Sequence, residues 1–491
     1  MDRLVDYIVI TVYLVGVAGF GILSGGKQKS VNDYFLGGKT MAWWAVGFSI
    51  VASETSTLTF ISIPGLAYKS NMHFLQLVFG YFIGRIIVSL VFIPAYYRGE
   101  LETAYDFLGR RFGPFIRKFM STVFIVTRVL ASGVRLFATS IPVHIITGWD
   151  YGVCILVIGV FTLIYTFAGG LRAVVAMDVV QLFIYLGGAA LSMYIILNRL
   201  PGGWNDVMSY AVTEVTDKFE IINLHFGNSL IGFLSSPYTL IGGLLGGTFL
   251  TMASHGTDQL LVQRLIGCRS ARDGQKALML DATLIVLQFL FFLVLGLCLF
   301  AFYGGATYQQ LGLASSDEIF PKFIIDNLPA GISGFVIAGV LASAMGSLSS
   351  SISSLASSTY LDLFRPARQR AGMPDDSGLF WSRLFTLLWG ITLMGGAMLF
   401  IHTTNPVVEL GLKIASITYG GLLGTFFLGF FFTKTGTIDA CAGFIAAIAV
   451  MGSVLFFTGI DYTWHTFIGC AVCITVGNAS RLTRGFLAGG R

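Results

Sequence analysis

Apolar runs of about twenty residues follow one another along the whole chain, and short polar segments separate them. The hydrocarbon core of a bilayer is about 30 Å thick, and about 20 apolar residues of helix cross it. Alternating segments of about ten residues, typical of membrane β-barrels, do not occur in the sequence. We therefore predict an all-α polytopic membrane protein with about 13 transmembrane helices. The predicted spans are 5–24, 42–67, 72–97, 117–142, 150–168, 174–198, 229–254, 277–304, 330–360, 378–401, 406–432, 438–458 and 464–481.

The composition agrees with this fold class. Of the 491 residues, 55% are hydrophobic and only 11% are charged, against about 25% charged residues in an average soluble domain. The net charge is +5 and the basic residues form no stripe, which excludes a nucleic-acid binder. Six cysteines are scattered, and the C-x-x-C formed by Cys470 and Cys473 lies inside an apolar run. Packing of small side chains explains this pair better than a metal or redox role.

The basic residues predict an orientation. The first apolar run has Asp2 and Asp6 at its head and Lys27 and Lys29 after its end, the reverse of a cleaved signal peptide. A retained first helix with its N-terminus outside puts 21 Lys and Arg on the cytoplasmic side, five outside and four within spans. The positive-inside rule supports this arrangement. We expect an integral protein of the plasma (inner) membrane, with the N-terminus outside and the C-terminus cytoplasmic.

Two of the spans are interrupted at equivalent places. The second span, residues 47–68, is rich in Ser and Thr, contains Glu54 and ends in Pro64-Gly65. The seventh, residues 240–259, has four glycines before His255 and Asp258. Such a pair of breaks, five spans apart, is the sequence pattern of a transporter built from inverted repeats, with the site at the breaks. The ninth span has nine serines within residues 342–358, which serve either helix packing or a polar site.

Ionisable residues within spans indicate function, or pair with one another. The acids are Glu54, Asp178 and Glu409, and the bases are Arg85, Arg128, Arg135 and Lys413. Glu409 and Lys413 have the spacing of a pair on one helix. We expect Glu54 to point toward Arg128 or Arg135. Asp178 follows the Gly169-Gly170 break, where it either caps a helix or binds a cation.

Four motifs together resemble the sodium:solute symporter family over essentially the whole chain. They are residues 165–173 (YTFAGGLRA) with Asp178 beyond them, residues 52–60 (ASETSTLTF), residues 254–264 (SHGTDQLLVQR) and the serine-rich ninth span. The resemblance implies a LeuT-like core of five plus five inverted helices. It divides the chain into an N-terminal extra helix and cytoplasmic link (1–41), a first five-helix repeat (42–198), an extracellular loop (199–228), a second repeat (229–433), and two C-terminal helices with a short tail (434–491).

The resemblance also implies two sets of sodium ligands. The main set is the backbone carbonyls of Ala52, Thr55 and Ser343 with the hydroxyl of Ser347, and uncharged oxygens of this kind suit a hard cation. Where the family usually has a second hydroxyl this chain has Gly346, so that site is one ligand short. A deeper set found in some members matches Asp178, Ser349 and Ser350.

The solute site implied by the resemblance lies between the broken helices. Its expected residues are Ser56, Thr59, Phe74, Thr251, Ser254 and His255. Family members that transport sugars have large aromatic residues near positions 254 and 255, and members that transport sialic acid have an arginine near position 131, where this chain has Ala131. We expect Arg135 to hold an anionic solute, because a guanidinium pairs well with a carboxylate. A buried structural pair is the other interpretation of Arg135.

We therefore predict a sodium-coupled secondary symporter that imports a small polar organic solute by alternating access. The solute class stays open among sugar, sialic acid, amino acid and carboxylate. Sodium is the coupling ion, membrane lipid is the surrounding partner, and no organic cofactor, nucleic acid or obligate protein partner is expected. The six histidines have no spacing typical of a metal or nucleophile set, so an enzyme is not expected. The alternative is a proton-coupled transporter of the same fold, because Glu54 can carry a proton.

Overall fold

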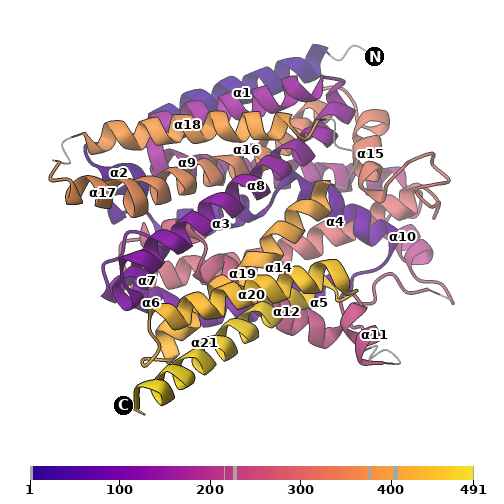
Figure 1. Ribbon diagram of the computed structural model, residues 1–491. Helices are drawn as coiled ribbons and strands as arrows, with labels where there is room; N and C mark the ends of the chain where they lie inside the picture. The colour runs from indigo at the N-terminus through magenta and orange to yellow at the C-terminus, as the bar shows by residue number, and fades with distance from the viewer. Residues whose placement is uncertain (1–3, 215, 225–228, 374–376, 402–406, 490–491) are drawn as a thin grey trace.

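The computed structural model describes residues 4–214, 216–224, 229–373, 377–401 and 407–489, which form helices and no β-strand. The helices run mostly side by side in one bundle (Figure 1). In chain order they are α1 (Leu4–Gly25), α2 (Val31–Leu36), α3 (Trp43–Glu54), α4 (Thr57–Lys69), α5 (Phe74–Ile87), α6 (Ile93–Arg98), α7 (Ala104–Phe112), α8 (Pro114–Thr147), α9 (Tyr151–Arg199), α10 (Trp204–Ala211), α11 (Leu230–Ser235), α12 (Leu240–Gly256), α13 (Gln259–Ile266), α14 (Ala271–Phe302), α15 (Ile319–Asn327), α16 (Ile332–Ser358), α17 (Arg365–Arg370), α18 (Gly378–Met398), α19 (Val407–Phe431), α20 (Thr437–Phe457) and α21 (His465–Gly489).

Seven helical stretches in the described ranges are long and apolar enough to cross a membrane, and the bent pair α3 and α4 makes an eighth. Several of these stretches are longer than one crossing needs. Helix α9 has 49 residues, which corresponds to about 74 Å, more than twice the hydrocarbon thickness. It is broken at Gly170, where φ is 58° and ψ is −153°, so α9 contains the two spans predicted at 150–168 and 174–198. The predicted total of thirteen spans stays a prediction.

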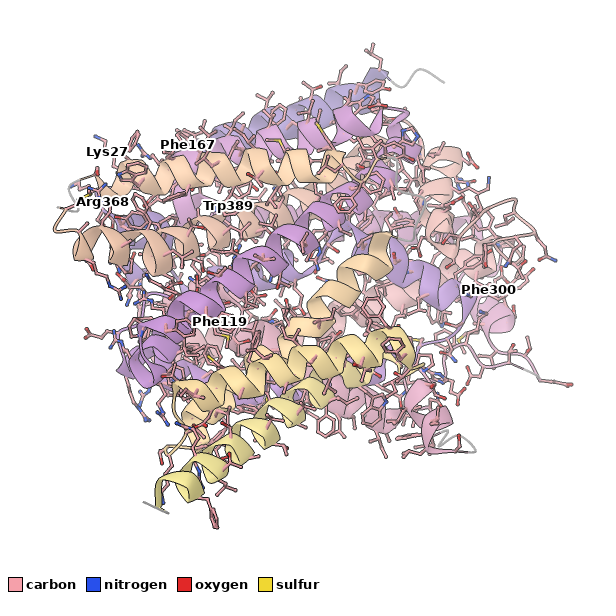
Figure 2. All side chains as sticks on the ribbon, in the orientation of Figure 1. Lys27, Phe119, Phe167, Phe300, Arg368 and Trp389 are labelled. Atoms are coloured by element: carbon pink, nitrogen blue, oxygen red, sulfur yellow. The ribbon has the colours of Figure 1, made fainter. Side chains whose placement is uncertain are left out.

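Large apolar side chains point outward along the bundle. Val12, Leu90 and Phe183 are 66%, 67% and 57% exposed, an exposure that suits a lipid-facing surface. Figure 2 shows Lys27 and Arg368 at one end and Phe300 toward the other.

Two features of the loops differ from the sequence prediction. The span predicted from residue 229 is divided, because α11 ends at Ser235 and α12 begins only at Leu240. Helices α10 and α15 lie in connections for which we predicted no helix. Both are short, with eight and nine residues. A search for apolar runs of about twenty residues does not detect helices of that length.

The interruption in the second span is a sharp bend of 65° between α3 and α4. Thr55 and Ser56 are both extended there, with ψ angles of 104° and 169°. Ser and Thr side chains compete for backbone hydrogen bonds and weaken a helix at such a place. In the seventh span α12 ends at Gly256 and α13 begins at Gln259, with the Asp258 carboxylate capping α13 through the Leu260 amide.

The helices pack in two reciprocal sets. Helices α3 and α4 pack against α14, and α12 packs against α5. Likewise α9 packs against α16, and α19 packs against α8. If α3/α4 and α12/α13 each begin a repeat, these contacts are equivalent pairs. Two related halves predict this reciprocity.

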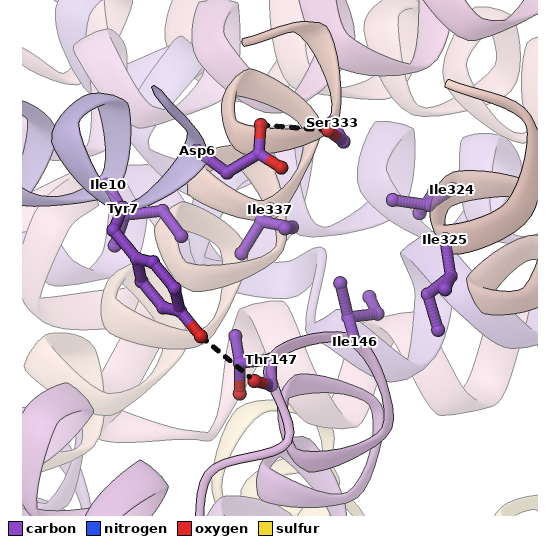
Figure 3. Close-up of a pocket in the computed structure, with 9 residues that line it drawn as sticks. All are labelled: Asp6, Tyr7, Ile10, Ile146, Thr147, Ile324, Ile325, Ser333 and Ile337. Atoms are coloured by element: carbon purple, nitrogen blue, oxygen red, sulfur yellow. Dashed lines mark hydrogen bonds between the residues drawn. The ribbon is translucent and has the colours of Figure 1, made fainter. Parts of the chain in front are cut away.

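The first helix is fastened to α16 by a carboxylate. Asp6 of α1 accepts hydrogen bonds from the Gly331 and Gly334 amides at 2.7 and 2.8 Å and from the Ser333 hydroxyl at 2.8 Å. These amides belong to the N-terminus of α16, which has no cap from its own sequence, and a negative charge stabilises that end of a helix. Tyr7 reaches the Thr147 carbonyl beside a small cavity (Figure 3).

Helix α1 begins and helix α21 ends at opposite ends of the bundle (Figure 1). Helix α1 starts at the end where α10 and α15 lie, and α21 finishes at the other end, on the side of α6 and α7 (Figure 1). An odd number of crossings produces this arrangement.

Candidate functional site

The bend between α3 and α4 brings the predicted main sodium ligands to the centre of the bundle. Ala52 and Thr55 are each 1% exposed, and the end of α3 leaves backbone carbonyls that no following turn can satisfy. Facing them is the middle of α16. A Cβ atom built on Gly346 of α16 lies 3.5 Å from the Ala52 carbonyl oxygen, so α16 approaches the end of α3 closely at this position.

Ser343 and Ser347 of α16 are buried, and their hydroxyl hydrogens are already used. Ser343 donates to the Val340 carbonyl at 2.8 Å, and Ser347 donates to the Ala344 carbonyl at 3.0 Å. A hydroxyl that donates still has lone pairs for a cation. The donor set around the break therefore suits sodium, although which oxygens bind it stays a prediction.

Asp178 is fully buried and lies in a network that the sequence did not predict. Its Oδ2 accepts from the Ser49 hydroxyl at 2.5 Å, from the Ser53 hydroxyl at 3.3 Å and from Arg264 Nη2 at 3.0 Å. Arg264, which we expected among the cytoplasmic loop charges, is 0% exposed. A buried guanidinium needs a carboxylate to offset the loss of its hydration, and Asp178 supplies it.

Arg264 also changes the interpretation of the deeper sodium set. Its Nη2 donates to Ser350 Oγ at 2.6 Å, and Ser349 donates to the Gly346 carbonyl at 3.0 Å. The guanidinium thus contacts two of the three groups, Asp178 and Ser350, that the resemblance assigns to a second sodium ion. In this arrangement Arg264 provides the positive charge beside Asp178 Oδ2.

Glu54 does not point toward Arg128 or Arg135, so that expectation is wrong. It forms an ion pair with Arg85 of α5, whose Nε is 2.5 Å from Asp281 Oδ2 of α14. Arg85 reaches Glu54 because α14 packs against both α3 and α4 at the break and also against α5, which carries Arg85. His255 Nε2 is 3.6 Å from a carboxylate oxygen of Glu54 and of Asp281.

This group has the ligand types of a metal site. One ligand atom from each of Glu54, His255 and Asp281 lies within 4.8 Å of the others. However, Arg85 bonds to both carboxylates, so the two acids already have a cation between them. We interpret the group as a buried ion-pair cluster that joins α3, α5, α12 and α14.

The two arginines of α8 differ in their partners. Arg128 pairs with Asp258, and Tyr419 also donates to Asp258 Oδ2 at 2.9 Å. Arg135 makes no hydrogen bond or ion pair within the described part of the chain. The predicted pair Glu409 and Lys413 lies outside the side chains that the structure describes.

The other predicted solute residues fall into two groups. Thr59 and Ser254 are partly exposed, as is Arg135. Ser56, Thr251 and His255 are buried, and the side chain of Thr251 faces Gly84 of α5. Phe74 packs against the rings of Tyr238 and Phe289, with centroids 5.3 and 5.2 Å away. The structure brings His255 close to Glu54 at the break, whereas Phe74 belongs to an aromatic cluster.

Sequence reasoning missed three buried polar residues at this site: Gln181, Arg264 and Asp281. Asp281 lies inside the eighth apolar span, where an acid is itself unusual. Gln181 follows Asp178 by three positions and therefore shares its helix face. Arg264 had no such signal, because it follows the seventh span and resembles an ordinary loop charge.

Residues 34–447 match the model of the sodium:solute symporter family. The sodium/sialic acid symporter of Proteus mirabilis is 26% identical over 477 residues, which cover 96% of this chain and 94% of that protein. The human sodium/iodide cotransporter is 28% identical over 458 residues, 91% of this chain and 68% of that protein. A solved substrate-bound, outward-open structure of a Na⁺-coupled sialic acid symporter superposes with a TM-score of 0.85 at 26% identity, covering 98% of each chain.

Proposed function

Because the chain belongs to the sodium:solute symporter family, we propose that it imports a small organic anion together with sodium. As a family member it is an integral membrane protein with a LeuT-like fold, and a sodium-coupled symporter of a small solute. It is a transporter and not an enzyme, and sodium is its coupling ion. What we add is the charge of the solute, the direction of transport and the residues that bind.

Arg135 carries the proposal of an anionic solute. An unpaired guanidinium at membrane depth is costly, whereas Arg85, Arg128 and Arg264 each have a carboxylate partner. A solute carboxylate would complete the missing pair with two parallel hydrogen bonds. The substrates for which the two relatives are named agree with this assignment, because iodide is an anion and sialic acid carries a carboxylate.

The solute would bind between the two broken helices. Thr59 and Ser254 are partly exposed there, on α4 and α12, and can donate hydrogen bonds to solute oxygens. Ser56 and His255 support them from the buried ends of the same helices. We keep Thr251 and Phe74 as positions that shape the solute cavity through packing. Organic anions such as sialic acid or a smaller carboxylate are therefore the class to test first, ahead of sugars and amino acids.

Sodium would bind at the break, with Ala52, Thr55 and Ser343 offering carbonyls and Ser347 its hydroxyl. Asp178, with Ser349 and Ser350 around it, would supply the charge that attracts the ion deeper into the protein.

We place the N-terminus outside and the C-terminus in the cytoplasm of the plasma (inner) membrane, because the basic loops then face the cytoplasm. The repeats would be 42–198 and 229–433, and their reciprocal packing supports this division.

The test uses purified protein and a panel of N-acetylneuraminate, lactate, glucose and proline, each with sodium or with choline. A transported anion should raise the melting temperature more in sodium than in choline, because the two ligands stabilise the same state. Glucose or proline in place of the anions as the stabilising solute would contradict the assignment of charge.

Variants of Arg135 then test the proposed solute contact. Arg135→Gln should weaken the affinity for the best anion about tenfold or more, because a hydrogen-bonded charge pair is lost. Arg135→Lys should lie between wild type and Arg135→Gln, since lysine keeps the charge without the planar fork. Arg128→Lys is the matched control on the same helix, where the guanidinium is already paired, and it should lower thermal stability more than affinity. Unchanged anion affinity in Arg135→Gln would assign Arg135 to structure.

A further inference from the structure

A groove on the outside of the bundle is lined by α3, α14 and the second half of α9. Its volume of about 300 Å³ is at the lower end of the range for ligand pockets, about 300–1,000 Å³. Val51, Leu182 and Gln288 form its buried side and are 1%, 2% and 4% exposed. Phe183 and Leu287 at its open edge are 57% and 56% exposed. The groove therefore opens onto the surface that faces lipid.

Apolar side chains line this groove, with one exception. Of the described residues that line it, only Gln288 is polar. Its Nε2 donates to Thr55 Oγ1 at 2.6 Å and its Oε1 accepts from the Tyr185 hydroxyl at 2.8 Å, so both ends of the amide already have partners. A polar headgroup would lose its hydration there without gaining hydrogen bonds, whereas a hydrocarbon chain would not. The chemistry of the groove therefore favours an acyl chain.

The walls of the groove lie at one membrane depth. Val51, Leu182 and Leu284 come seven to nine positions after the starts of their predicted spans, which corresponds to about 10–14 Å along a helix. The starts of α3 and α14 also lie together, because the Met41 amide before α3 donates to the Gly267 carbonyl before α14. All three spans start on the side that we place in the cytoplasm, and half of the hydrocarbon core is about 15 Å thick. The groove therefore faces the acyl chains of the cytoplasmic leaflet.

The groove also lies where the two packing sets of the bundle meet. Helices α3 and α14 belong to one set, and α9 belongs to the other. In a transporter built from inverted repeats the two states differ in how such sets contact each other, so the width of a groove between them differs as well. Gln288 of α14 connects the sets behind the groove, because it bonds to Thr55 at the bend after α3 and to Tyr185 of α9.

We propose that an acyl chain of a cytoplasmic-leaflet lipid occupies this groove and controls how fast the transporter changes state. The chain makes the contacts that an empty groove would lack, and so stabilises the state in which the groove is open. It gains little hydrophobic free energy by entering, because the bilayer is as apolar as the groove. Binding is therefore weak and reversible, which suits a site that changes shape in every transport cycle. A lipid site of this kind goes beyond the proposed function, since solute and sodium binding do not require it.

The first experiment identifies the occupant by photolabelling. The purified protein is reconstituted into vesicles of phosphatidylethanolamine and phosphatidylglycerol in which a small fraction of the lipids carries a diazirine near the middle of one chain, and labelled residues are identified by mass spectrometry. The label should appear on Phe48, Leu186 and Leu284, which line the groove and are only partly exposed. A label confined to Phe183 and Leu287 at the edge would overturn the proposal. A label absent from edge and walls alike would indicate that a protein neighbour covers the groove, and would overturn it too.

Ala190→Phe tests the effect on transport, because Ala190 lines the groove and is exposed, and a phenyl ring there takes the place of the chain. It should reduce the label on the walls about fivefold or more, and the maximal rate of anion uptake by a similar factor, since a tethered ring cannot leave when the groove changes shape. Ala449→Phe is the matched control. Ala449 is an exposed alanine of α20, which packs against α19 and α21, and this variant should match wild type in both measurements.

The two measurements separate the possible failures. An Ala190→Phe protein that loses the label but transports at the wild-type rate would overturn control of transport by the chain. An Ala190→Phe protein that keeps the label on the walls would overturn the placement of the chain. If Ala190→Phe does not fold, the label on the wild type still decides whether the groove holds a chain. If the wild type takes up no anion in sodium, the proposed function fails, and the photolabelling still confirms or overturns the lipid site.

Discussion

Arg85 lies between Glu54 and Asp281, and Arg264 lies beside Asp178, so ion pairs join five helices of the core. Removing one partner of such a pair leaves the other charge buried and uncompensated. Arg135 differs from these arginines because no acid in the described structure neutralises it. Arg135 is therefore the arginine to which we assign a solute charge, and the others have structural partners.

Asp281→Ala should lower the free energy of unfolding by about 3–5 kcal/mol, the usual effect of breaking a buried pair. The measurement is the melting temperature of the purified protein. The matched control is Asp326→Ala, which breaks the exposed pair with Lys322 and should cost no more than about 0.5 kcal/mol. Equal, small effects of the two substitutions would show that Arg85 does not depend on Asp281.

The residues of the site were only partly predictable. The motifs led us to expect Ala52 and Thr55 at the break in the second span, where the structure has both buried. Their role as sodium ligands, with Ser347, stays a prediction. The partners of the charged residues could not be predicted, because Glu54 of α3 meets Arg85 of α5 where both helices pack against α14, and sequence spacing does not reveal that contact. Gln181 was not predicted, because an uncharged amide side chain within an apolar helix gives no signal in the pattern of charged residues.

Glycine sets the geometry of the longest helix. Gly170 breaks α9 with a φ of 58° and a ψ of −153°, a region open in practice only to glycine. A Cβ atom there would lie 2.5 Å from the Tyr34 carbonyl oxygen of α2. The break turns the chain between the two parts of α9 and lets α2 pack against it.

Gly170→Ala should therefore destabilise the protein by about 1–3 kcal/mol from backbone strain alone, and by more because of the contact with Tyr34. Gly187→Ala on the same helix is the control and should change the melting temperature little, since its Cβ has only ordinary contacts. Size-exclusion profiles and melting curves of both variants check this expectation. A Gly170→Ala protein as stable as Gly187→Ala would mean that the break at Gly170 is not required.

At the element scale the sequence predicted the breaks better than the ends of the helices. The Ser- and Thr-rich stretch around Glu54 coincides with the bend between α3 and α4. In the seventh span the four glycines lie inside the continuous helix α12, and the break follows them at Thr257 and Asp258. The start of α12 was placed eleven residues early, at 229 instead of Leu240. Residues 229–239 are apolar enough to look like part of the span. However, Ser229 caps α11 and Thr239 caps α12, so two separate helices form there. Hydropathy does not detect such capping hydrogen bonds.

For the whole molecule, the reciprocal packing of its halves explains how one bundle can serve two states. If the set of α3/α4, α5, α12/α13 and α14 moves against the set of α8, α9, α16 and α19, equivalent contacts open on one side as they close on the other. The charge at the break then links ion binding to this motion. The fold could be predicted from the sequence because its breaks, motifs and span order agree, whereas the number of crossings needs the membrane itself.

The measurement that tests this account most directly is anion uptake into proteoliposomes with an imposed sodium gradient. The inward gradient should drive accumulation of the best anion from the thermal panel, and replacement of sodium by choline should abolish it. If more than one sodium ion accompanies each monovalent anion, a negative interior should increase uptake further, because each net positive charge gains about 2.3 kcal/mol per 100 mV. Equal accumulation in choline, or accumulation driven by a proton gradient alone, would contradict the account.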